Sequence, residues 1–187
     1  MRRIVPLIGL TGLLLTSLGH ATDYRIDSSR SQAAFGVRLL WVHTINGRFE
    51  QVGGDVSVDP QGITRVDAHI AVDSLVMSSE RVRRWVLAPE FFDGAQYPSI
   101  RFLSDAVPFS ALVRGGALDG ELSLRGMTQP ARFELEPTSC TVTIAQPCLI
   151  EAHGRLSRSA FGMDSHRATL SDQVQLDLRI VLAPAMR

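Results

Sequence analysis

The residues of this chain that could perform catalysis are few and poorly spaced for it. Asp164, Ser165 and His166 are the residue types of a hydrolytic triad, but they are consecutive, and adjacent residues do not easily orient as a proton relay. The sequence contains neither a G-x-S-x-G nucleophile motif nor an H-E-x-x-H zinc motif. It therefore predicts a protein that is not an enzyme, and a hydrolase or redox enzyme dependent on His166 is the weakest hypothesis.

The remaining histidines and the two cysteines do not form a pattern typical of metal sites. Polar positions of expected strands hold His69 and His153, which favours solvated side chains over metal ligands. Cys140 and Cys148 lack the paired C-x-x-C spacing of zinc sites. In an oxidising compartment they favour a disulfide over two free thiols, worth about 2–3 kcal/mol of stability.

The first 21 residues have the layout of a secretory signal peptide. Arg2 and Arg3 precede an apolar run over 4–18, and Gly19-His20-Ala21 is a small-x-small cleavage site. The alternative is a membrane anchor, but the apolar run is short of the roughly 20 residues that span a bilayer. The sequence predicts a signal peptide over 1–21, a periplasmic location and one domain over 22–187.

Charge and composition argue against nucleic-acid binding. The chain has 19 basic and 19 acidic residues, so its formal net charge is zero. Proteins that bind nucleic acid need a basic excess to neutralise phosphates. We therefore expect no nucleic-acid partner.

Most of the predicted domain shows the alternation of apolar and polar residues that is typical of antiparallel strands with one wet face. The clearest stretches are 32–39, 66–73, 118–125, 131–136, 150–157 and 173–182. A helix is predicted within 78–88, capped by Ser78 or Ser79 and ended by Pro89. Its arginines predict a solvated face or a contact with anionic headgroups: Arg81, Arg83 and Arg84. Seven or eight strands and one helix predict an all-β closed barrel or two-sheet sandwich.

Three motifs in fixed order make the sequence similar to one known family. Phe91-Phe92-Asp93 is followed by Tyr97-Pro98, then G-x-L-x-x-x-G-x-T-x-P over 120–130, then R-S-x-F-G-M over 158–163. In this order and spacing they resemble the YceI family of bacterial periplasmic proteins, over about residues 23–182. The resemblance implies an extended, lipocalin-like, eight-stranded antiparallel β-barrel whose pore holds a polyisoprenoid chain, including isoprenoid quinones.

The resemblance and the strand faces together predict a function without chemistry. We expect a periplasmic carrier for a long isoprenoid lipid, either a polyprenyl lipid or an isoprenoid quinone, with no required cofactor. The candidate lumen residues are Phe35, Val37, Leu39, Phe49, Ala68, Ile70, Trp85, Phe91, Phe92, Tyr97, Ile100, Phe102, Leu122, Leu124 and Phe133. Eight strands can enclose one narrow ligand, and small inward residues widen the lumen.

Two questions remain open: whether the lumen is empty, and what the departures from the family pattern mean. Phenylalanines could fill the lumen, and the protein would then be a non-catalytic accessory protein that acts through a protein or membrane partner. Transient membrane contact and a monomer or homodimer fit both hypotheses. The sequence also departs from the family, because Leu39 and residues 85–88 are apolar where relatives usually have polar residues. Either a head-group contact is missing here, or the helix packs more tightly on the barrel.

Overall fold

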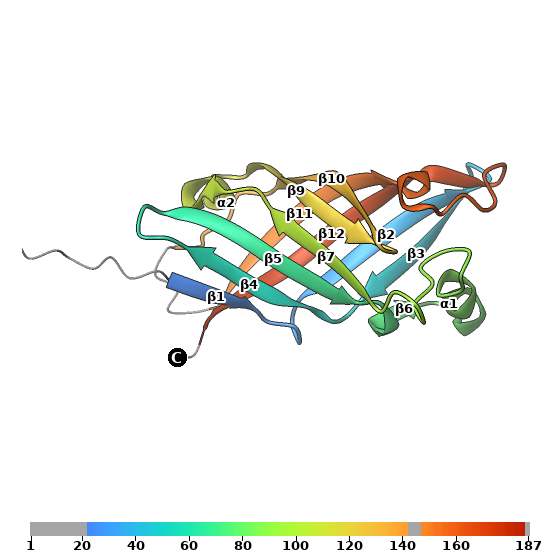
Figure 1. Cartoon of the computed structure of the whole chain (residues 1–187), viewed down its shortest axis with the longest axis horizontal. Helices are drawn as coiled ribbons and strands as arrows, with labels where there is room; N and C mark the ends of the chain where they lie inside the picture. Colours follow the sequence, from blue (N-terminus) through green and yellow to red (C-terminus); the bar gives the residue numbers. More distant parts are fainter. Residues whose placement is uncertain (1–21, 142–146, 186–187) are drawn as a thin grey trace, which may run out of the picture.

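The structure, a computed structural model, describes residues 22–141 and 147–185 (Figure 1). The predicted signal peptide therefore lies outside the described residues. The strands are β1 (Thr22–Ile26), β2 (Gln32–Leu39), β3 (His43–Phe49), β4 (Val52–Val58), β5 (Ile63–Ala71), β6 (Leu75–Met77), β7 (Ser99–Ser104), β8 (Val107–Pro108), β9 (Gly116–Leu124), β10 (Met127–Leu135), β11 (Cys148–Ser157) and β12 (Leu170–Pro184). The helices are α1 (Glu80–Val86) and α2 (Phe109–Arg114), with 3₁₀ turns η1 (Val72–Ser74) and η2 (Arg158–Phe161).

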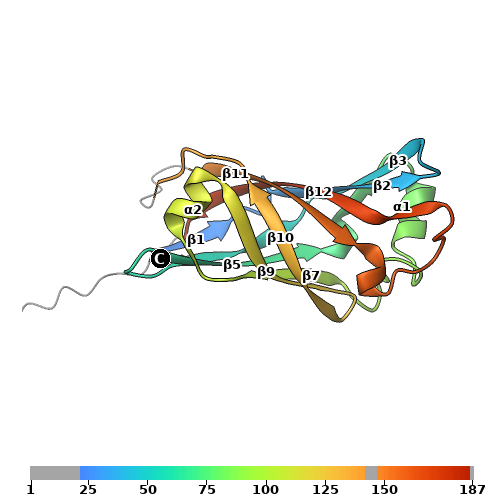
Figure 2. The same ribbon diagram turned by 90° about the horizontal axis from the view of Figure 1, so that it is seen from above.

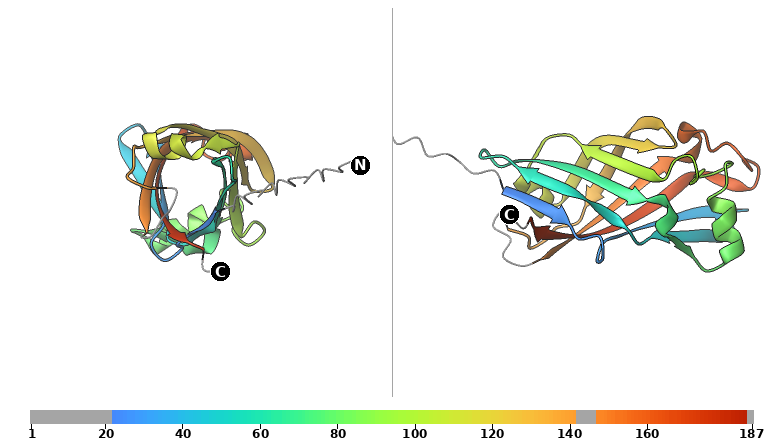
Figure 3. Two further views of the ribbon diagram at one scale, coloured as in Figure 1. Left: turned by 90° about the vertical axis from the view of Figure 1, so that its left-hand side faces the viewer. Right: turned by 60° about the horizontal axis from the view of Figure 1, so that its bottom comes forward.

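The strands close into an eight-stranded antiparallel barrel. The ring runs β1-β4-β5-β7-β9-β10-β11-β12, and β12 pairs back to β1 with Tyr24 opposite Pro184. Seen along the barrel axis, the ribbon forms a closed ring (Figure 3, left). The predicted barrel is confirmed, and two separate flat sheets are excluded.

The barrel is elongated because two of its strands continue past a break. β2 continues the line of β1 along β12, and β4 continues the line of β3, so β12 pairs with β1 near one end and with β2 near the other. Ser31 lies in the break between β1 and β2, where its buried hydroxyl accepts a hydrogen bond of 2.9 Å from the Val181 amide. A buried amide that loses its ladder partner is costly unless another acceptor replaces it. The hydroxyl of Ser31 therefore lets the strand bend without an unsatisfied amide.

Two short α-helices lie at opposite ends of the barrel (Figure 2). The predicted one is confirmed as α1, with Ser79 as its N-cap accepting from the Val82 amide. The prediction of a single helical segment was wrong, because α2 follows Pro108. Six residues are too few to show helical periodicity, although Phe109 and Leu112 share its buried side. Neither α-helix of the described residues is long and apolar enough to cross a membrane.

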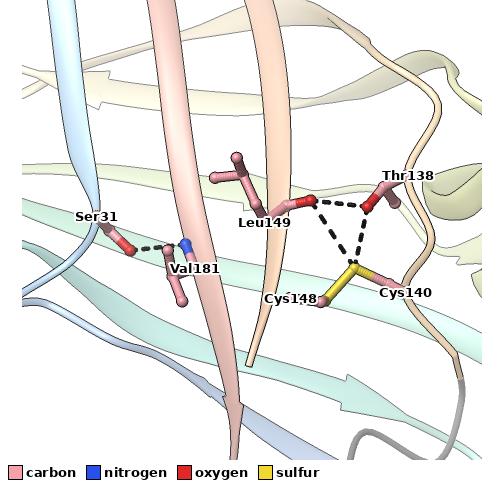
Figure 4. The surroundings of a disulfide bond; sticks show 6 residues. All are labelled: Ser31, Thr138, Cys140, Cys148, Leu149 and Val181. Carbon is pink, nitrogen blue, oxygen red and sulfur yellow. Dashed lines mark hydrogen bonds between the residues drawn. A yellow bond between two sulfur atoms is a disulfide. The ribbon is translucent and has the colours of Figure 1, made fainter. Parts of the chain in front are cut away.

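The predicted disulfide is present between Cys140 and Cys148, whose Cα atoms are 5.5 Å apart (Figure 4). Beside it, the Thr138 hydroxyl donates to the Leu149 carbonyl over 2.7 Å, so the segment before the disulfide is fastened to β11. The bond therefore closes the loop that joins β10 to β11.

We expect Cys148→Ser to lower the free energy of unfolding by about 2–3 kcal/mol, because the loop then regains entropy in the unfolded chain. Urea unfolding of the variant should match that of the wild-type protein under reducing conditions. Identical unfolding of oxidised and reduced wild-type protein would show that the disulfide contributes no stability.

Bidentate ion pairs join neighbouring strands on the outer wall. Arg101 donates to Asp67 over 2.7 and 2.6 Å, and Arg132 donates to Asp119 over 2.6 and 2.8 Å. These hydrogen bonds lower the pKa of both carboxyl groups below the ordinary 3.8. The folded barrel therefore binds these protons less readily than the unfolded chain does.

This linkage predicts a specific acid sensitivity. The stabilisation is complete above the unfolded pKa and is lost as the pH falls through the lower folded values, that is, below about pH 4. We expect Asp67→Asn to cost less than about 1 kcal/mol at neutral pH, because the pair is exposed. The variant should also lose less stability than the wild type between about pH 5 and pH 2. If urea unfolding shows that the free energies of unfolding of the variant and the wild type change in parallel with pH, the linkage is contradicted.

Candidate functional site

An apolar cavity of about 190 Å³ lies inside the barrel. Every strand of the ring contributes side chains to it, and its surface is almost wholly apolar. Its lining extends from Leu112 on α2 at one end to Trp85 on α1 at the other. The cavity is therefore long relative to its volume, which suits one narrow chain better than a bulky ring system.

The alternation seen in the sequence places these side chains. On β9, Leu118, Leu122 and Leu124 line the cavity, while the intervening Glu121 is exposed on the outer wall. The same period holds on β11, where Ile150 and Ala152 face inward. A polar-out, apolar-in barrel of this kind follows from the two-residue repeat of a strand.

All but two of the predicted lumen residues line the cavity. Their contact with a lipid stays a prediction. The lining members are Phe35, Val37, Phe49, Ala68, Ile70, Trp85, Phe91, Phe92, Ile100, Phe102, Leu122, Leu124 and Phe133. Leu39 is half-buried at the base of the β2–β3 hairpin, where it pairs with His43 and Leu170. Tyr97 packs instead against Gly126 in the β9–β10 turn.

Several lining residues were missed by sequence reasoning. Val52 and Val56 on β4 line the cavity, but the intervening Gly53-Gly54 obscured the alternation. Plain alternation through Gly54 would have found them, because β4 pairs with β5 without a register shift and Gly54 lies directly against the β5 backbone, on the same face as the two valines. Leu112 was missed together with its helix α2.

The phenylalanines line the lumen without filling it, because glycines on neighbouring strands make room for their rings. A Cβ on Gly47 would lie 2.4 Å from the ring of Phe35, and one on Gly154 would lie 2.7 Å from the ring of Phe133. Each of these rings therefore lies against the backbone of the adjacent strand, as aromatic residues do over glycine in other sheets. The alternative of a core filled by phenylalanine is not what the structure has.

An aromatic cluster lies at the α1 end of the cavity. The ring centroids of Trp85 and Phe91 are 4.5 Å apart, and His166 lies 5.3 Å from Trp85 and 6.1 Å from Phe91, stacked on the latter. Trp85 and Phe91 line the cavity, whereas His166 is exposed. The three rings therefore connect the lining of the cavity with an exposed side chain at the α1 end.

Arg158 is the only charged residue that lines the cavity among those the structure describes. It is 3% exposed, and its guanidinium donates to the carbonyls of Ser165 (2.7 Å), Ser171 (3.0 Å), Leu170 (3.3 Å) and Met163. Burial lowers the pKa of this guanidinium below its usual range. Because the guanidinium is turned toward backbone carbonyls, it holds the loop before β12 and leaves the lumen apolar.

The residues first considered for catalysis are not arranged for it. Asp164 pairs with Arg167, and His166 stacks on Phe91. His153 lies on the outer wall, 2.7 Å from Asp177. Within 22–141 and 147–185, no cluster of three or more histidine, cysteine or acidic residues could hold a metal ion. The described walls of the cavity are almost wholly apolar, which suits the binding of apolar molecules.

Known proteins resemble this chain in fold and in sequence. The structure resembles that of Burkholderia cenocepacia BcnA, with a TM-score of 0.70 at 19% identity, covering 83% of this chain and 98% of that one. It also resembles a polyisoprenoid binding domain from Saccharophagus degradans, described as implicated in plant cell wall breakdown, with a TM-score of 0.65 at 14% identity over 87% of this chain and 98% of that one. A UPF0312 protein of Vibrio cholerae is 28% identical over 143 residues, which are 73% of this chain and 74% of the relative.

The family assignment rests on the sequence itself. Residues 24–182 match the YceI-like domain, which covers nearly all of the described barrel from β1 into β12. The predicted resemblance is confirmed, and the chain belongs to the family of YceI-like domain proteins.

Proposed function

We propose that this protein is an exported, periplasmic binding and carrier protein that holds one long isoprenoid lipid, a polyprenyl lipid or an isoprenoid quinone, in its barrel. The observation that carries the proposal is the apolar cavity, which every strand of the ring lines. The polyisoprenoid binding domain of Saccharophagus degradans has the same fold, which supports this ligand class. The disulfide supports export, since such bonds persist in oxidising compartments.

The energy of binding would come from the tail. Each buried methylene contributes about 0.8 kcal/mol, so a tail of roughly 20 carbons gains on the order of 10 kcal/mol before the costs of ordering and association. Among the described lining residues, the one charged side chain is not free to recognise a head group, because Arg158 bonds to backbone carbonyls. A polar head group would therefore lie at an end of the barrel, in contact with water.

The experiment is extraction of the purified protein with organic solvent followed by mass spectrometry. We expect an isoprenoid lipid in reproducible amounts, and we expect the emptied protein to take up ubiquinone. An emptied barrel that takes up no ubiquinone, purified repeatedly without lipid, would contradict the proposal. Uptake of straight-chain fatty acids in preference to ubiquinone would retain the carrier and overturn the isoprenoid assignment.

A further inference from the structure

The tip of the β2–β3 hairpin carries three consecutive apolar side chains that point into water. Leu40 is 53% exposed, Trp41 81% and Val42 79%. Other large exposed apolar residues of the described chain, such as Leu103 and Leu149, occur singly on the outer wall and are about half as exposed as Trp41. Single exposed apolar residues are ordinary, whereas a contiguous apolar run marks an interaction site.

The backbone at this tip has a strained conformation that bulky side chains rarely adopt. Leu40 has a φ of 48° and Trp41 a φ of 65°, in the left-handed region that favours glycine and asparagine. Bulky residues there are unusual, and such strain concentrates at functional sites. The base of the hairpin is firm, because Leu39 pairs with Leu170 and the Leu40 amide donates to the Thr169 carbonyl over 2.8 Å. The turn therefore presents its side chains outward on a fixed support.

The tip projects from the same end of the barrel as α1 and the loop that precedes β12, and α2 lies at the other end (Figures 1 and 2). This is the end at which Trp85 and Phe91 line the cavity and His166 stacks on Phe91 and contacts Trp85 edge-on. Whatever surface binds the tip is thereby brought to the α1 end of the cavity.

Unpaired positive charge accompanies the apolar tip. Arg38 precedes it on β2, and Arg81 and Arg84 are exposed on α1. None of the three has an ion pair among the described residues, whereas Arg83 bonds to the carbonyls of Asp73 and Leu75. The acidic side chains of this end that have no ion pair within the described chain are Asp73, Glu90, Asp93 and Asp172, and the last of these accepts hydrogen bonds from Ser157 and Ser159. Arginines at the same end as an apolar tip complement phosphate groups at a membrane surface.

We propose that this hairpin tip (Leu40, Trp41 and Val42) docks the protein on an anionic phospholipid bilayer, with Arg38, Arg81 and Arg84 on the lipid phosphates. Tryptophan prefers the headgroup region, where its ring is half apolar and its N–H is hydrated. A projection of three residues cannot bury the roughly 800 Å² per partner of a stable protein interface, but it can enter a lipid surface. The inference adds a partner to the proposed function and does not depend on the identity of the lipid in the lumen.

The test is flotation of the purified protein with vesicles of phosphatidylethanolamine and phosphatidylglycerol, compared with phosphatidylcholine alone. The double variant Leu40→Asn, Trp41→Gly gives the turn residues that tolerate a positive φ, so it should fold at least as stably as the wild type. We expect its partition onto the anionic vesicles to fall at least tenfold. Leu103→Asn, a substitution of an exposed apolar residue on the outer wall, should leave partition unchanged.

Two further measurements test the role of the arginines and separate membrane docking from binding in the lumen. Arg81→Ser with Arg84→Ser should weaken partition about fivefold for each arginine at low salt and less at high salt. The hairpin variant should still take up ubiquinone from detergent, so loss of docking is distinguishable from loss of lumen binding. The proposal is overturned if the wild type does not float with anionic vesicles, if the hairpin variant floats equally well, or if Trp41 instead mediates association of two copies.

Discussion

Replacement of Ala152 by tryptophan is expected to abolish ubiquinone uptake while the barrel still folds. Ala152 is buried on β11 and lines the cavity, beside Leu178 on β12. An indole ring there takes up much of a space of about 190 Å³. Because the new ring enters existing space, the overpacking penalty should stay near the low end of the usual range of about 1–3 kcal/mol. We expect uptake to fall by more than tenfold.

The matched control is Arg155→Trp, which adds the same ring to an exposed position of the same strand. It should retain both stability and uptake. Ala33→Phe, on the other side of Leu178, provides a second obstruction if Ala152→Trp folds poorly. Normal uptake by a folded lumen variant would show that the lipid binds outside the barrel.

The interior of the barrel was predictable from the sequence because a strand repeats every two residues. Once the polar face of β9 or β11 is known, the opposite face must be buried, and the lumen residues on those strands follow directly. Register between strands was not needed for this inference. Predicted lumen residues on strands, such as Phe35, Phe102 and Phe133, accordingly line the cavity.

The free space inside the barrel could not be predicted from the alternation of apolar and polar residues. Alternation says that Phe35 and Phe133 face inward, but it does not say whether their rings cross the lumen or lie along its wall. That depends on Gly47 and Gly154, which face the two phenylalanines across strand pairs. Pairing of strands distant in sequence is a tertiary property, so a filled core and an open one have the same pattern in one dimension.

The residues outside strands were the least predictable part of the site. Tyr97 belongs to a family motif, yet it packs on Gly126 and stays out of the lumen, since loop position is set by contacts and not by a repeat. The hairpin tip at Leu40 and Trp41 was likewise hidden, because an apolar run at a strand end resembles a buried strand. Only the fold shows that these side chains are exposed.

The loop before β12 depends on one buried charge, and removal of that charge should cause the largest loss of stability. The guanidinium of Arg158 donates to four main-chain carbonyls, two within this loop and two at the start of β12. Arg158→Met fills similar space and leaves those carbonyls without donors. Hydrogen bonds from a charged group and the desolvation of buried acceptors together predict a loss of about 3–5 kcal/mol. A chain of this length should then unfold roughly 10 °C lower.

Arg158→Lys should recover only part of this loss, because an ammonium group cannot reproduce the planar fork that reaches several carbonyls at once. Arg155→Met, at an exposed arginine three residues earlier, should unfold like the wild type. Below its lower melting temperature, Arg158→Met should still take up ubiquinone, since the lumen stays apolar. A variant with wild-type stability and no uptake would instead assign Arg158 to the ligand, because a purely structural arginine changes stability first.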